Sequence, residues 1–189
     1  MNRNDDIEAA VKTLQAGGII LYPTDTVWGI GCDAGNAAAV QKIYTLKQRS
    51  EEKSMIILVS DEAQILDYTN ETSPVIFDFI KGIHKPTTVI YERAKNLAPN
   101  LINKDGSIGI RLVKDDFCRE LIRRFRKAIV STSSNISGYP APTFYSDIDG
   151  SIKNGVDYIV QHRRDDFTPS APSTIVKLLR DGSIEVIRP

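Results

Sequence analysis

The segment LKQRSEEKS at residues 46–54 carries cations whose types and spacing suit phosphate binding. Arg49 offers a planar fork to two phosphate oxygens, while Lys47 and Lys53 offer mobile point charges. These residues predict a polyphosphate clamp. The alternative is that cations at the end of a helix only stabilise its dipole, and this segment taken alone favours that alternative.

A second polar stretch, STSSNISG at residues 131–138, directly follows the apolar run 128–130. Small side chains let a ligand approach the backbone, and hydroxyl and amide groups can bind a ribose or a carboxylate. With Pro140, Pro142 and Thr143 it forms a long irregular segment, and such segments often carry function. The stretch predicts either a ligand-facing loop or a plain surface turn.

The third stretch is YPTDTVWG at residues 22–29. Thr24, Asp25 and Thr26 follow an apolar run that Pro23 closes, so they lie at the carboxyl end of a predicted strand. Ligands tend to bind at such strand ends in α/β sheets. An Asp/Thr turn between two strands is the alternative, and the residues alone favour it.

The commonest signatures of other enzyme classes are missing from the sequence. It has no Walker A loop, no nucleophile elbow and no HExxH motif, and the third glycine of GIGCDAG is one residue late for a dinucleotide loop. Two distant cysteines and two histidines argue against a zinc cluster and favour a reducing, cytoplasmic setting. No protein-bound metal is therefore expected.

Alternating apolar and polar runs predict the elements that must position these stretches. We expect helices at 6–16 (with Asp5 as N-cap), 36–46, 61–68, 74–83, 115–125 and 146–153, and strands at 19–22, 27–32, 55–59, 87–91, 107–113, 128–131 and 156–160. A final hairpin turns at Asp181 and Gly182. The irregular alternation and the antiparallel hairpin predict an α+β fold with a mixed sheet in a single domain, residues 1–189.

Charge and hydropathy narrow the range of partners. Lys+Arg and Asp+Glu both count 24, which argues against a dedicated nucleic-acid coat. The basic run at 119–127 lies on a helix with an apolar opposite face, and a solvated helix face is the preferred interpretation over an RNA footprint. The apolar runs are too short to span a bilayer and the N-terminus has no signal-peptide pattern, so no membrane partner is expected.

The combination of motifs is more specific than any one of them. YPTDTVWGIG, LKQR, GIR at 109–111, STSSNISG and PSTIV at 172–176, in this order, resemble the YrdC/TsaC family of threonylcarbamoyl-AMP synthases in its short, single-domain form. The resemblance covers about residues 17–189. It implies an α+β, three-layer arrangement whose twisted mixed sheet encloses a positively charged cavity.

The family resemblance also implies an activity. L-threonine, bicarbonate and ATP would give L-threonylcarbamoyladenylate and pyrophosphate, for N6-threonylcarbamoyladenosine at tRNA position 37. ATP would be a substrate carrying Mg²⁺, and the expected partners include tRNA or double-stranded RNA and the proteins that transfer the group to tRNA. The alternatives are a non-catalytic RNA-binding protein of the same fold and a carbamoyl-adenylate enzyme of hydrogenase maturation, which has a much longer chain.

On the nucleotide side, the resemblance assigns Lys47 and Arg49 to the ATP phosphates as the catalytic cations, with Lys53 as a weaker third. Ser133 and Asn135 of the Ser-x-Asn motif are expected to contact the nucleotide and the intermediate, and Arg188 near the C-terminus is expected near the nucleotide.

On the threonine side, the resemblance places Thr24 and Ser133 against the substrate. Arg111 is expected to pair with the substrate carboxylate, and Ser173 to lie beside it. The sequence departs from the family pattern mainly at 83–88, IHKPTT, and at 161–172, QHRRDDFTPSAP, and these departures put the details of substrate binding in question.

Overall fold

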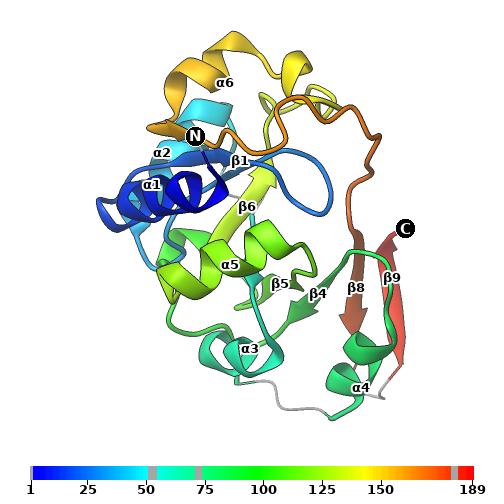
Figure 1. The fold of residues 1–189 in the computed structure, drawn as a ribbon. Coiled ribbons are helices and arrows are strands. Elements are labelled where there is room, and N and C mark those ends of the chain that lie inside the picture. The colour runs from blue at the N-terminus through cyan, green and yellow to red at the C-terminus, as the bar shows by residue number, and fades with distance from the viewer. Residues whose placement is uncertain (1, 51–54, 71–73, 180–182) are drawn as a thin grey trace.

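The computed structural model describes residues 2–50, 55–70, 74–179 and 183–189 (Figure 1). Its strands form one mixed sheet in the order β7-β1-β2-β6-β3-β5-β4-β8-β9. The strands are β1 (Ile20–Tyr22), β2 (Gly29–Gly31), β3 (Ile56–Val59), β4 (Thr87–Tyr91), β5 (Ile108–Leu112), β6 (Ile129–Ser133), β7 (Tyr158–Ile159), β8 (Thr174–Leu178) and β9 (Ile184–Arg188).

The centre of the sheet shows why it is mixed. Ile57 of β3 lies opposite Ile110 of parallel β5 on one side and opposite Val130 of antiparallel β6 on the other. Beyond β6, β2 runs antiparallel, with Gly29 opposite Ser133. The predicted mixed sheet is therefore confirmed, and β6 ends at Ser133, two residues beyond the predicted strand 128–131.

The helices are α1 (Arg3–Gln15), α2 (Ala37–Lys47), α3 (Glu62–Tyr68), α4 (Pro74–Gly82), α5 (Asp116–Phe125) and α6 (Gly150–Gly155). Five of the helices, α1, α2, α3, α5 and α6, begin after a residue whose side chain caps them. Asn36 caps α2 by accepting from the Ala39 amide at 3.1 Å, as predicted. The cap predicted for the first helix was wrong: the Asn2 side chain accepts from the Asp5 amide at 3.0 Å, so α1 starts three residues earlier.

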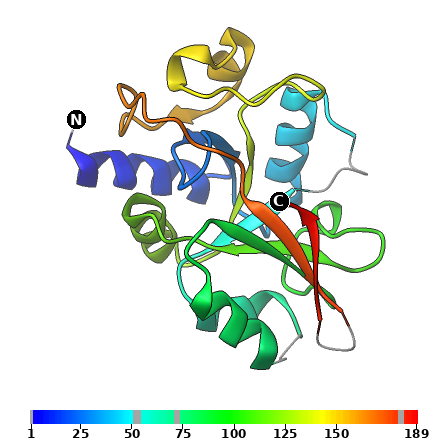
Figure 2. The same cartoon turned by 90° about the vertical axis from the view of Figure 1, so that its right-hand side faces the viewer.

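Helices cover both faces of the sheet. Along β3, Ile57 and Val59 belong to one apolar cluster and Leu58 to another, because successive side chains point to opposite faces. The cluster that contains Leu58 lies under α1 and α5, and the cluster that contains Ile57 and Val59 lies under α2 and α6. Figure 2 shows α1 and α2 on opposite sides of the strands, which is the predicted three-layer arrangement.

Two irregular segments connect the last elements and cross the strand ends. After β6, residues 134–149 contain only a 3-10 turn, Tyr145–Asp147, so the helix predicted at 146–153 is shorter and later. Residues 160–173 link β7 to β8 without regular structure. The predicted turn of the final hairpin, Asp181 and Gly182, lies outside the described residues. Among the described helices, none combines the length and apolar character needed to span a bilayer.

Candidate functional site

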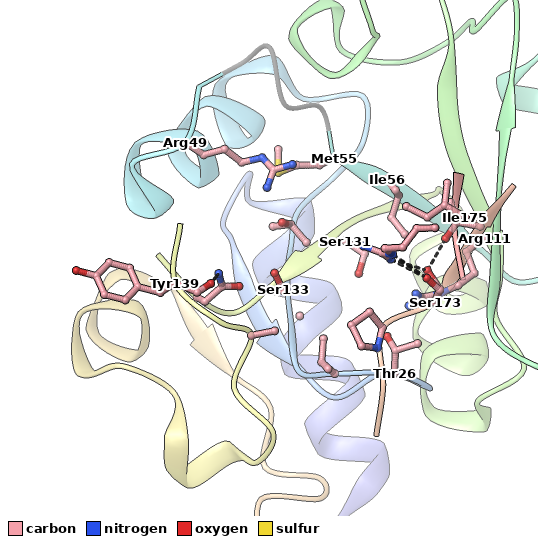
Figure 3. Close-up of a pocket in the computed structure, with 18 residues that line it drawn as sticks. Thr26, Arg49, Met55, Ile56, Arg111, Ser131, Ser133, Tyr139, Ser173 and Ile175 are labelled. Atoms are coloured by element: carbon pink, nitrogen blue, oxygen red, sulfur yellow. Dashed lines mark hydrogen bonds between the residues drawn. The ribbon is translucent and has the colours of Figure 1, made fainter. Parts of the chain in front are cut away.

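A cavity of about 320 Å³ opens where the ends of β2, β5, β6 and β8 converge (Figure 3). Residues from position 26 to position 188 line it, so segments far apart in sequence share the site. Most of the residues predicted from the sequence lie on its wall, namely Arg49, Arg111, Ser133, Asn135, Ser173 and Arg188.

The wall formed by β2 and β6 is made of small residues. Gly29 faces Ser133 across the two strands, and a Cβ added to Gly29 would lie 3.3 Å from Ser131 Oγ. That spacing is tighter than most Cβ contacts, so a larger residue would press on the hydroxyl. The polar stretch that follows the apolar run therefore lies on the cavity wall and is not a plain surface turn.

Arg111 lies at the inner end of the cavity with 3% of its surface exposed. Its Nη2 atom is 3.1 Å from Asp25 Oδ1, an ion pair without hydrogen-bond alignment. Its Nε–H has no hydrogen-bond partner among the described residues. A buried guanidinium with an unused donor at a cavity is suited to bind an anion. Asp25 was not selected from the sequence, although its place in the TDT strand end pointed to it.

Ser173 and Arg188 form a second polar group at the same wall. Ser173 Oγ lies 2.9 Å from Thr88 Oγ1, and Arg188 Nη2 donates to the Ser173 carbonyl at 2.7 Å. Burial lowers the pKa of Arg188, and the nearby charge of Arg111 lowers it further. Because the charge of Arg111 disfavours the charge of Arg188, a bound anion would be stabilised beside Arg188.

Asn135 is attached to its own loop and still presents an acceptor. Its Nδ2 donates to the carbonyls of Ile136 at 2.9 Å and Tyr139 at 2.6 Å. Gly138 takes the turn with φ +90°, which favours glycine. Asn135 Oδ1 is buried without a hydrogen-bond partner among the described residues, so it remains able to accept from a ligand.

The two cations of the phosphate clamp predicted from LKQR, Lys47 and Arg49, lie in different surroundings. Gln48 ends α2 in the left-handed region, φ 49°, and this reversal brings Arg49 onto the cavity wall. Burial lowers the pKa of Arg49. Lys47 is only 1% exposed and does not line the cavity; its Nζ donates to the carbonyls of Ser133 and Asn135.

Burial also lowers the pKa of Lys47 to about 7, and the charge of Arg49 acts in the same direction. The third predicted cation, Lys53, lies outside the described residues.

Thr24 lies behind the cavity wall. Its hydroxyl donates to the Val27 carbonyl at 2.8 Å and accepts from the Thr26 amide at 3.0 Å. Since that donor is used, the 2.9 Å contact between the two threonine hydroxyls is donated by Thr26. Thr26 lines both the main cavity and a second one of about 270 Å³, whereas Thr24 lines only the second. The same TDT strand end could have indicated Thr26.

Among the described residues, no group of three or more His, Cys, Asp or Glu side chains could hold a metal ion. The polar side chains that line the main cavity are arginines, hydroxyls and one amide, beside apolar ones such as Ile56 and Ile175, and the described wall includes no carboxylate. Such a donor set can bind phosphates and a carboxylate and stabilise charge on them.

Comparisons with known proteins identify the family. A threonylcarbamoyl-AMP synthase of Idiomarina loihiensis is 33% identical over 159 residues, which cover 82% of this chain and 85% of that protein. E. coli YciO is 23% identical with a TM-score of 0.85, over 99% of this chain and 89% of its own.

P. abyssi Sua5 complexed with L-threonine is 21% identical with a TM-score of 0.86, and this chain spans 55% of its length. At these identities the two solved structures show the fold alone, and they confirm the predicted YrdC-like architecture. The family model Sua5/YciO/YrdC, described as "Telomere recombination", matches residues 12–189. Because that match covers nearly the whole chain, the protein belongs to the Sua5/YciO/YrdC family.

Proposed function

We propose that this chain is an L-threonylcarbamoyladenylate synthase, a nucleotidyltransferase that converts L-threonine, bicarbonate and ATP into threonylcarbamoyl-AMP and pyrophosphate. The observation that carries the proposal is a cavity lined by Arg49, Arg111 and Arg188. The name of the I. loihiensis relative, threonylcarbamoyl-AMP synthase, supports the reaction. The product would supply N6-threonylcarbamoyladenosine at tRNA position 37, with residues 1–189 acting as one domain.

The three arginines make the cavity positively charged in this proposal. Arg49 binds the triphosphate from the end of α2, since a guanidinium can engage two phosphate oxygens at once. Arg188 approaches from β9 and is held by the Ser173 carbonyl, so its charge is fixed before the nucleotide arrives. Preorganised charges of this kind stabilise the developing negative charge without reorganising during the reaction.

Arg111 receives the threonine carboxylate. Its Nε–H, which has no acceptor in the described part of the chain, supplies a donor, and the ion pair with Asp25 keeps the guanidinium in place. The Thr26 hydroxyl donates its hydrogen bond to Thr24 Oγ1, and its lone pairs can accept a hydrogen bond from the threonine amine. The P. abyssi Sua5 structure contains L-threonine, which supports a threonine site within this fold.

Asn135 and Ser133 orient the nucleotide and the reacting carbamate. Both side chains line the cavity, and the buried Oδ1 of Asn135 can accept from a ligand donor. A buried acceptor is costly when it is left without a partner, so a ligand donor there contributes to affinity.

The reaction needs positioning more than covalent chemistry by the protein. The threonine amine adds to bicarbonate with loss of water, and an oxygen of the resulting carbamate attacks the α-phosphorus of ATP. The bond from the α-phosphorus to its bridging oxygen breaks, and pyrophosphate leaves. The cavity aligns the carbamate with the α-phosphate and stabilises phosphoryl charge, a task for which the described wall needs no histidine or cysteine.

Mg²⁺ enters with ATP in this proposal. It supplies charge neutralisation on the phosphates, and magnesium bound through substrate phosphates needs few protein ligands. The described wall of the cavity offers hydroxyls and one amide oxygen rather than carboxylates, which fits an ion held mainly by the nucleotide and water.

The test is incubation of the chain with ATP, radiolabelled bicarbonate and each amino acid in turn. Pyrophosphate release that requires both threonine and bicarbonate, with label in an adenylate product, is expected. Arg49→Ala should lower this rate on the order of 10²-fold, the scale of losing one preorganised charge contact. Release that does not depend on threonine, or wild-type turnover in the variant, would contradict the assignment.

A basic groove on another face favours RNA binding as a second candidate function. The groove holds about 310 Å³ between α1 and α5, and Arg3, Arg119, Arg123 and Arg124 line it. Arg124 is partly neutralised by Glu120 at 2.7 Å. RNA binding that weakens steeply with salt, without pyrophosphate release, would favour a non-catalytic RNA-binding protein.

A further inference from the structure

Lys47 connects the end of α2 to the loop that follows β6. Its Nζ donates to the carbonyls of Ser133 and Asn135, and its own carbonyl accepts from the Ser137 amide at 2.8 Å. Main chain and side chain of one residue thus attach the same loop to the helix. Arg49, two residues later, lines the cavity, whereas Lys47 does not.

We propose that Lys47 is a positioning residue: it holds the segment Ser133–Asn135 so that two side chains face the nucleotide, and Arg49 is the member of the Lys-x-Arg pair that contacts phosphate. Naming the ligand as a nucleotide rests on the proposed function. The attachment of the loop to α2 does not depend on it.

The two carbonyls that accept from Lys47 belong to the residues on either side of Ser134, where the chain bends after the end of β6. Ser133 and Asn135 both line the cavity, while Ser134 is 0% exposed. Bonds from one donor to the carbonyls of 133 and 135 therefore fix the rotation of the segment and keep both side chains on the cavity face.

Burial argues against direct phosphate contact by Lys47. A lysine that binds phosphate as a point charge must be reached by the anion, and only 1% of Lys47 is exposed. Two of its three N–H donors already have carbonyl acceptors.

The first test compares binding of AMP and ATP by calorimetry. Lys47→Met should weaken both nucleotides by the same factor, about 10-fold, because the loop serves the part that they share. Arg49→Met should weaken ATP more than AMP. Lys42→Met is the matched control, since Lys42 lies on the same helix and donates to a backbone carbonyl, Gly17, away from the cavity. Loss of ATP binding with unchanged AMP binding in Lys47→Met would overturn the proposal.

A second test uses the wild-type chain, so it does not depend on the folding of a variant. Acetylation by an amine-reactive reagent, mapped by mass spectrometry, should be far slower at Lys47 than at exposed Lys42, with or without ATP. Rapid acetylation that ATP suppresses would identify a phosphate contact and overturn the positioning role. If the wild type fails to make an adenylate while Lys47 stays protected, the proposed function fails and the attachment of the loop stands.

Discussion

At the scale of single residues, the contacts that matter most are those between a buried charged side chain and its polar partner. Arg111 has one donor near Asp25 and another that no described residue accepts, and both residues are largely buried. A carboxylate that neutralises part of a guanidinium's charge also fixes its orientation. The ion pair is therefore expected to control affinity for the substrate carboxylate rather than the stability of the fold alone.

We expect Asp25→Asn to raise the KM for threonine by about 10-fold and Arg111→Gln to lower kcat/KM for threonine by about 10²-fold, about 3 kcal/mol. Steady-state pyrophosphate release against threonine concentration measures both. Asp33→Asn is the control, because Asp33 pairs with Lys127 at 2.7 Å and does not line either cavity beside the TDT strand end. An unchanged KM in Asp25→Asn would show that the ion pair does not prepare the site.

The buried ammonium of Lys47 also predicts a pH dependence of stability. Burial lowers its pKa in the folded protein to about 7, below the ordinary value of 10.5, so between these two pH values the unfolded chain binds more protons. Stability should therefore rise with pH from about 7 upward, by at most about 1.4 kcal/mol per pH unit from this one group. Urea unfolding of wild type and Lys47→Met between pH 7 and 8.5 measures the difference. A slope that is equal in both would contradict a lowered pKa.

At the scale of elements, the sequence predicts strands and helix caps well because they depend on local pattern. Apolar runs mark β1, β3 and β5, and Asn36 and Asp115 cap their helices as expected. The extension of β6 to Ser133 was missed because it depends on pairing with Gly29 of β2, a contact distant in sequence. The burial of Lys47 was missed for the same reason: a sequence shows charge but not what packs around it.

Gly31, the second glycine of β2, gives a prediction at this scale. A Cβ at Gly31 would lie 2.5 Å from the Val130 carbonyl oxygen, a backbone atom that cannot rotate away. Gly31→Ala should therefore destabilise the fold by about 2 kcal/mol, the usual cost of overpacking. Chemical denaturation measures this, with Gly150→Ala as control because no atom lies within 4 Å of its added Cβ. A loss no larger than that of the control would mean that β2 can move away from β6.

At the scale of the whole molecule, the cavity joins parts of the chain that share few other contacts. Thr26 precedes β2, Arg49 follows α2, and Arg188 ends the C-terminal hairpin, yet all three line one wall. The resemblance located most of this set because its motifs come from each part. It did not separate the residues on the wall from those behind it, since Thr24 and Lys47 differ from Thr26 and Arg49 only in packing.

A ligand that contacts all of these parts should stabilise the chain as a unit. A ligand that binds only the folded state at 100 times its Kd adds about 2.7 kcal/mol, which for a chain of this size raises Tm by about 5–10 °C. We expect ATP with Mg²⁺ to do so in a thermal scan. Arg49→Ala should lose most of the shift, because its guanidinium binds the triphosphate in the proposed site.

Arg123→Ala provides the matched control for that scan. Arg123 is an exposed arginine of the groove between α1 and α5, on the face covered by those helices rather than at the strand ends. It should keep the full ATP-dependent shift. An equal loss of the shift in both variants would place the nucleotide on the α1/α5 groove, whereas a full shift in Arg49→Ala would remove this arginine from the phosphate site.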